Sequence, residues 1–88
     1  MAYTIRISDK AQRQVDRLPA HVQKRVARWI DLLAEDPYRP PSGQLAGYPE
    51  LRRIHASKDY VILYSVLEDE VLVLVVRVGH RREVYRSL

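Results

Sequence analysis

The sequence contains no cysteine among its 88 residues. Neither a disulfide framework nor a thiolate metal site can therefore stabilise the fold, and packing alone must do so. Long hydrophobic runs are also missing, because the longest, residues 71–76, is far shorter than the roughly 18 residues that cross a bilayer. Residues 1–4 open no signal-peptide pattern. We expect a cytoplasmic protein that makes no membrane contact.

Motifs for nucleotide or metal chemistry are missing too. The chain has no P-loop, no G-x-G-x-x-G and no G-x-S-x-G sequence, so nucleotide-driven chemistry has no support. The three histidines, His21, His55 and His80, are far apart and include no H-x-x-x-H pair. We expect no metal and no cofactor.

The composition is that of a small soluble domain with excess positive charge. Eighty-eight residues allow one domain, residues 1–88, because a second core could not be built from the remainder. Fifteen Lys and Arg against eleven Asp and Glu give a net charge of +4, and arginine supplies most of the excess. Arginine suits a polyanionic partner such as nucleic acid, although the same charge also serves ordinary solubility.

The first half of the chain predicts a strand followed by two helices. Residues 3–7 alternate with period two, which is typical of a strand. Ser8 offers an N-cap hydroxyl to a first helix, which Pro19 ends. A second helix with an apolar stripe is predicted from near Ala20 to Asp36. The short connection predicts a helical hairpin.

The second half predicts a sheet. Prolines and glycines in residues 37–50 indicate an irregular connection. Three strands are predicted after it: residues 51–56, 60–67 and 71–78. The short acidic segment 68–70 predicts that the last two pair antiparallel, and the continuous apolar run 71–76 predicts a central strand covered on both faces. The predicted fold is α+β: an N-terminal strand, then a helical hairpin packed on one face of a small, mainly antiparallel four-stranded sheet (β-α-α-β-β-β), with a short C-terminal tail.

Two groups of residues are candidates for chemistry. Arg53 and His55 alternate with Ile54, so they share the face opposite Ile54 and either grip a phosphate or form a solvated surface. Gly79 permits a change of direction before a cationic tail that only Glu83 opposes. The tail's candidates are His80, Arg81, Arg82, Tyr85 and Arg86.

The functional groups that RNA cleavage without a metal requires are present in the sequence. Attack by the 2′-hydroxyl requires a base, an acid for the departing 5′-oxygen, and cations around the phosphate oxygens. Arg53, Arg81 and Arg82 can supply the positive charge. His55, His80 or Tyr85 can move the protons.

The chain resembles the RelE/ParE superfamily of bacterial toxins. The likeness covers the helix ending "LLAEDPYRP", the segment "LAGYPELRRIHASKDYVILY" and the closing "VLVLVVRVGHRREVY", of which "VGHRREVY" is the most specific. The resemblance implies a metal-free α+β toxin. RelE-type members cut mRNA in the ribosomal A site, and ParE-type members inhibit DNA gyrase.

Site residues follow from the resemblance by position. It implies that Arg81 contacts the scissile phosphate or assists the leaving group and that Tyr85 acts as base or stacks on the substrate. Arg53 and His55 fall where the RelE branch has basic residues. Further residues are predicted to bind the substrate: Arg52, Lys58, Arg77, His80, Arg82 and Arg86.

One position departs from the RelE pattern. Many RelE-type sequences read Asp-Tyr-Arg where this chain has Asp59-Tyr60-Val61, so a charge-stabilising arginine is replaced by Val61. The segment "YVILY" also looks like the ParE branch. The favoured hypothesis is that the chain is a ribosome-dependent mRNA endonuclease. The alternatives are a gyrase inhibitor and an inactive relative.

The resemblance also implies partners. These are a cognate antitoxin, the ribosome with its mRNA or DNA gyrase, and operator DNA only as a toxin–antitoxin complex.

Overall fold

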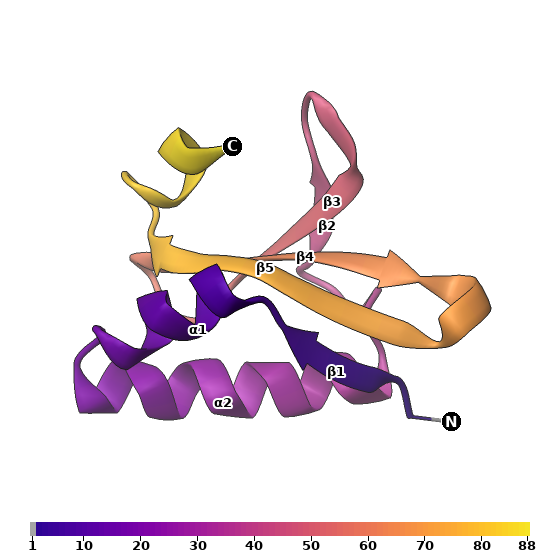
Figure 1. Ribbon diagram of the computed structural model, residues 1–88, viewed down its shortest axis with the longest axis horizontal. Helices are drawn as coiled ribbons and strands as arrows, with labels where there is room; N and C mark the ends of the chain where they lie inside the picture. Colours follow the sequence, from indigo (N-terminus) through magenta and orange to yellow (C-terminus); the bar gives the residue numbers. More distant parts are fainter. Residues whose placement is uncertain (1) are drawn as a thin grey trace.

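A single mixed sheet with helices on one side forms the architecture (Figure 1). The computed structural model describes residues 2–88. The strands lie in the order β1-β5-β4-β3-β2. The elements are β1 (Thr4–Ile7), α1 (Asp9–Asp16), α2 (Ala20–Glu35), β2 (Gly43–Leu45), β3 (Tyr48–His55), β4 (Tyr60–Leu67) and β5 (Leu72–His80), with 3₁₀ turns at Glu68–Glu70 and Val84–Ser87. The predicted α+β class, the helical hairpin and its place on one face of the sheet are confirmed.

Local signals account for the helix boundaries. The Ser8 hydroxyl accepts the backbone N–H of Ala11 at 3.1 Å, which caps α1 as predicted. Pro19 stands at the N-cap of α2 with extended ψ, and Asp36 ends the helix in extended geometry. No helix within residues 2–88 is both long and apolar enough to span a membrane.

The sheet has one strand more than the sequence predicts. Gly43–Leu45 forms β2 inside the segment expected to be irregular, and it pairs antiparallel with β3, which begins at Tyr48 rather than Leu51. The turn between them contains Gly47 at φ 83°, a conformation that glycine adopts without strain. A three-residue strand bordered by prolines and glycine carries too little periodicity to be seen in the sequence.

β5 lies inside the sheet, as predicted, but its two faces are covered unequally. It pairs parallel with β1 and antiparallel with β4. Val73 and Val75, which face the helices, are fully buried, whereas Leu72 and Leu74 on the other face are only half-buried. The side of β5 that faces the helices is therefore covered as predicted, whereas the other side is only partly covered.

A bulge in β5 changes which side chains face the helices. Leu63 pairs with Arg77 and Tyr64 with Val75, so Val76 is the extra residue. Beyond the bulge, Val78 joins the core beneath the helices. Arg77 consequently lies on the opposite face, beside Leu63.

Two hydrophobic clusters lie on the two sides of the sheet. The larger, between the sheet and the helices, contains Ala11, Val22, Val26, Ile30, Leu33, Ile54, Ala56, Ile62, Tyr64, Val73, Val75 and Val78. The smaller contains Leu45, Leu51, Val61, Leu63 and Val84. We call the two sides the helix face and the open face. In Figure 1 the β2–β3 hairpin and the C-terminal segment both stand on the open face.

Candidate functional site

Strand pairing gathers basic side chains on the open face. Arg53 pairs with Leu63, which pairs with Arg77, so the two arginines flank one buried leucine. His55 occupies the next row, beside Val61. Ile54 belongs to the cluster on the helix face, which confirms that its neighbours Arg53 and His55 point the other way.

The C-terminal segment folds back onto this face. Val84 is 1% exposed and packs in the same cluster as Val61 and Leu63, and Tyr85 packs against that cluster. The Arg53 Nη1 donates to the Tyr85 hydroxyl at 3.4 Å, a long hydrogen bond. A guanidinium from the middle of the sheet and a phenol from the tail therefore meet, although they are 32 positions apart.

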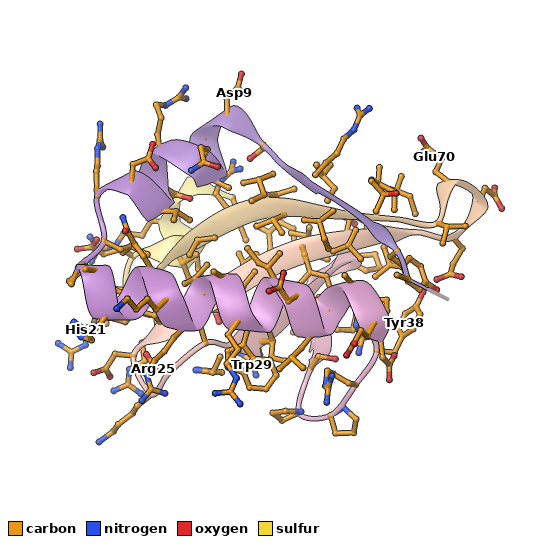
Figure 2. All side chains as sticks on the ribbon, turned by 90° about the horizontal axis from the view of Figure 1, so that it is seen from below. Asp9, His21, Arg25, Trp29, Tyr38 and Glu70 are labelled. Atoms are coloured by element: carbon orange, nitrogen blue, oxygen red, sulfur yellow. The ribbon has the colours of Figure 1, made fainter. Side chains whose placement is uncertain are left out.

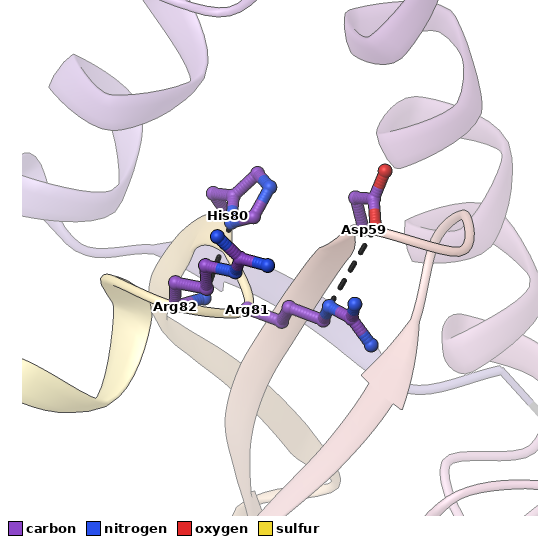
Figure 3. A network of polar contacts seen from close by, with 4 residues as sticks. All are labelled: Asp59, His80, Arg81 and Arg82. Carbon is purple, nitrogen blue, oxygen red and sulfur yellow. Dashed lines mark hydrogen bonds and ion pairs between the residues drawn. The ribbon is translucent and has the colours of Figure 1, made fainter.

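Arg81 is held at the edge of the same region (Figure 3). Its backbone N–H donates to the Asp59 carbonyl at 2.7 Å, and its Nε lies 3.6 Å from the Asp59 carboxylate. Both side chains are about half exposed, so this ion pair adds little to stability. Its geometric effect is to orient the Arg81 guanidinium.

His80 turns away from the open face. It pairs with Tyr60, whose ring it meets edge-on at 5.5 Å between centroids, and it lines a hollow beneath the tail together with Gln14 and Arg17 from the helix layer. Its Nδ1 accepts the backbone N–H of Arg82 at 3.2 Å. His80 therefore shapes the turn that carries Arg81 rather than joining Arg53 and Tyr85.

Arg52 also lies on the other face. Its Nη2 donates to the Ser42 hydroxyl at 2.8 Å, and its guanidinium lies 5.0 Å from the centre of the Tyr38 ring. Positions 52 and 54 of one strand share a face, so simple alternation could have separated Arg52 from Arg53 in the sequence.

The remaining predicted residues do not all lie in this region, because Lys58 lines a hollow with His21 and Arg25 of α2. Lys58 is exposed in the turn between β3 and β4, and Arg82 and Arg86 are exposed on the C-terminal segment. Arg77 is half-buried, and its Nη1 donates to the Val76 carbonyl at 2.7 Å. Sequence reasoning did not single out Asp59, because a lone acid in a turn gives no signal of which arginine it will meet.

A hydrogen-bonded network with shifted pKa values lies at the other end of β4. Glu68 accepts hydrogen bonds from the hydroxyls of Tyr3 and Tyr38. The bond from Tyr38 raises the pKa of that phenol to about 12, and the two phenols lower the pKa of the Glu68 carboxyl. This network ties the N-terminal strand to the β4–β5 turn.

No group of three His, Asp or Glu residues within residues 2–88 is arranged to hold a metal ion. The open face instead offers guanidinium groups, one imidazole and one phenol. These groups can bind a phosphate and transfer protons.

The amino-acid sequence matches a family of known toxins. Residues 5–85 match the family model described as the ParE toxin of the type II toxin–antitoxin system parDE. The "mRNA interferase toxin RelE" of Escherichia coli strain K12 is 30% identical over 88 residues, covering 97% of this chain and 92% of that protein.

Solved structures show the same fold. A mutant of the E. coli toxin RelE in the free state matches with a TM-score of 0.82 and 27% identity, covering 98% of this chain and 93% of that one. RelE in the intact E. coli RelBE toxin–antitoxin complex matches with a TM-score of 0.79 and 25% identity, covering 90% and 96%. The chain belongs to the RelE/ParE superfamily and is a toxin of a toxin–antitoxin system.

Proposed function

We propose that this toxin is a ribosome-dependent endoribonuclease that cleaves mRNA through attack by the 2′-hydroxyl, without a metal. The observation that carries the proposal is the contact between Arg53 and Tyr85 on the open face. Arg77 lies on the same face because it pairs with Leu63, as Arg53 does, and His55 lies two residues further along β3. The 30% identity to the mRNA interferase RelE of E. coli supports the same reaction.

Some of these residues can stabilise negative charge during the reaction, and others can transfer protons. A base removes the 2′-hydroxyl proton, the 2′-oxygen bonds to phosphorus, and the bond from phosphorus to the 5′-oxygen breaks as an acid protonates that oxygen. The products are a 2′,3′-cyclic phosphate and a 5′-hydroxyl. Arg53 and Arg81 stabilise the charge that develops on the phosphate oxygens, and Tyr85 or His55 transfers the protons.

Positioned RNA is essential to this proposal. The phenol and the imidazole are exposed or half-buried, so the open face does not exclude water by itself. A ribosome that holds the mRNA against this face would supply the missing enclosure and align the 2′-hydroxyl with the phosphate. Dependence on the ribosome therefore agrees with the openness of the face, and it implies that the toxin acts in the cytoplasm.

Mapping of mRNA ends tests the proposal. Purified toxin is added to translating ribosomes, and we expect codon-phased cuts that Arg81→Ala and Tyr85→Phe each reduce by roughly 10²–10³-fold. Lys10→Ala in α1, which removes an exposed cation on the other side of the molecule, is the matched control. Absence of phased cuts, or cuts that neither variant weakens, would contradict the proposal.

Inhibition of DNA gyrase is a second candidate function. Two observations favour it: the matching family model describes a ParE toxin, and Val61 is fully buried at the position where RelE-type sequences have an arginine. Because Val61 replaces this arginine, the site has one positive charge fewer than the RelE pattern. A supercoiling assay with excess toxin tests this candidate, which fails if gyrase proceeds at its normal rate.

A cognate antitoxin is the expected partner in either case. The related E. coli toxin is known in a RelBE toxin–antitoxin complex. An acidic or amphipathic antitoxin segment would complement the basic side chains of this chain, and the resulting complex rather than the toxin alone would bind operator DNA. Co-expression with the neighbouring open reading frame should yield a complex in which RNA cleavage is blocked.

A further inference from the structure

One side of α2 carries cations without partners. Lys24, Arg25 and Arg28 are exposed, and none has a hydrogen-bond or ion-pair partner for its side chain within residues 2–88. The helical repeat of 3.6 residues per turn places them in one sector of the helix, next to Trp29. Figure 2 shows Arg25 and Trp29 projecting from the same side of α2.

This side of the helix is hollowed. Lys24, Arg25, Arg28, Trp29 and Leu32 line a shallow cavity of about 470 Å³. A second hollow of about 350 Å³ shares Arg25 and extends to His21 and to Lys58 in the β3–β4 turn. We call His21, Lys24, Arg25, Arg28, Trp29 and Lys58 the α2 basic surface.

The cations of α2 are not arranged to stabilise the helix. In α1, Asp9 lies in the first turn and Arg13 in the last, which complements the helix dipole. α2 has no acid in its first turn and no base in its last turn. The helix dipole therefore does not explain why the positive charges gather on one side of α2.

The chemistry of the surface favours single-stranded nucleic acid. Trp29 is half-buried, so part of its ring packs on the core while the rest lines the cavity. An aromatic face beside arginines is the arrangement that stacks an unpaired base while holding the adjoining phosphates. An acidic peptide would use the charges but would gain less from the indole.

We propose that the α2 basic surface binds single-stranded RNA, with one base stacked on Trp29 and its phosphates held by Lys24, Arg25 and Arg28. The choice of RNA over DNA rests on the proposed function. This surface belongs to the helix layer, on the opposite side of the sheet from Arg53 and Tyr85. The toxin therefore contacts RNA on two faces, of which only one cleaves it.

The single tryptophan of the sequence makes the surface directly measurable. A Tyr85→Phe chain, in which cleavage is disabled, is titrated with a single-stranded oligouridylate of about 12 nucleotides. We expect quenching of the Trp29 emission, with binding that weakens as salt is added because each phosphate contact releases counterions. Poly-glutamate of equal charge serves as the comparison ligand.

Charge variants localise the binding. In the same Tyr85→Phe background, Lys24→Gln with Arg28→Gln should weaken oligouridylate binding and reduce the slope of log K against log salt by about 1.4, since each contact contributes roughly 0.7. Lys10→Gln with Arg13→Gln removes the same charge from the exposed side of α1 and should leave the slope nearly unchanged. Trp29→Phe, measured with labelled oligouridylate and checked by its unfolding curve, should weaken binding about fivefold or more.

The outcomes are decisive in both directions. Quenching that the α2 double variant abolishes and the α1 double variant preserves supports the proposal. Absent quenching, equal effects of the two double variants, or quenching by poly-glutamate but not by RNA overturns it, the last result indicating an acidic protein segment instead. Because cleavage on ribosomes is measured separately, an active nuclease without this binding refutes only the α2 surface, and binding without any cleavage refutes only the nuclease.

Discussion

The two faces of the sheet differ in how they are built. On the helix face, the side chains of α1, α2 and the sheet interlock in a large cluster that includes the fully buried Leu33 and Tyr64. On the open face, the smaller cluster is partly covered by the tail residues Val84 and Tyr85, and basic side chains surround it. Stability therefore resides mainly on one face, which leaves the other free to carry charges that a core could not accept.

The largest expected effect compares one leucine from each face. Leu33→Ala, which empties a fully buried position beneath α2, should lower the free energy of unfolding by about 2–5 kcal/mol. Leu74→Ala on the open side of β5 removes the same atoms from a half-buried position and should cost about 1–2 kcal/mol. Urea unfolding of both variants checks this, and equal losses would contradict the assignment of stability to the helix face.

Neighbouring arginines provide the second comparison. Arg53→Ala should reduce RNA cleavage by roughly 10²–10³-fold with little change in unfolding, because Arg53 is exposed and faces Tyr85. Arg52→Ala should leave cleavage nearly unchanged and lower stability instead, because Arg52 donates to Ser42 and packs over Tyr38. Cleavage rates and urea midpoints of the two variants are measured together; matching losses of activity would show that the two faces do not separate function from packing.

Truncation of Val84, which anchors the C-terminal segment, should have a smaller effect on both stability and RNA cleavage. Val84→Ala should cost about 1–3 kcal/mol, because the side chain is buried against Val61 and Leu63. It should also lower cleavage about tenfold at temperatures where the chain stays folded, since Tyr85 loses the neighbour that positions it. Circular dichroism in the cleavage buffer is the control. Full activity in a destabilised Val84→Ala chain would mean that Tyr85 needs no such anchor.

The smallest effect is the pH dependence of the Glu68 network. Glu68 has a lowered pKa in the fold, so its contribution is present above the unfolded pKa of about 4.3 and is lost as the pH falls through the lower folded value. Tyr38 has a pKa raised to about 12, so its contribution is present below pH about 10 and is lost as the pH rises through about 12. Glu68→Gln should flatten the stability profile at both ends, as thermal unfolding across the pH range would reveal, while RNA cleavage at neutral pH stays unchanged.

Much of the fold could be predicted because its signals are local. Ser8 and Pro19 mark helix boundaries through caps and backbone restrictions that depend only on adjacent residues. The acidic segment at Glu68–Glu70 joins β4 and β5 as an antiparallel pair. β2 was not predicted because its three residues gain strand geometry only by pairing with β3.

The candidate site could be predicted in its residue types but less well in its grouping. Alternation around Ile54 places Arg53 and His55 together, and the structure keeps them on one face. Arg52 and His80 were predicted to bind the substrate with them. Strand geometry instead turns both side chains toward the helix face. The roles assigned to Arg81 and Tyr85 stay predictions.

Local sequence specifies the helices, the main strands and the alternation of apolar and basic positions, because these depend on residues close together in the chain. Two features of the site depend on the folded chain as a whole: the bulge at Val76 places Arg77 on the open face, and the C-terminal segment brings Tyr85 to Arg53. The contact between Arg53 and Tyr85 joins residues 32 positions apart, and the register at the bulge is selected by the packing of the whole sheet rather than by any local preference.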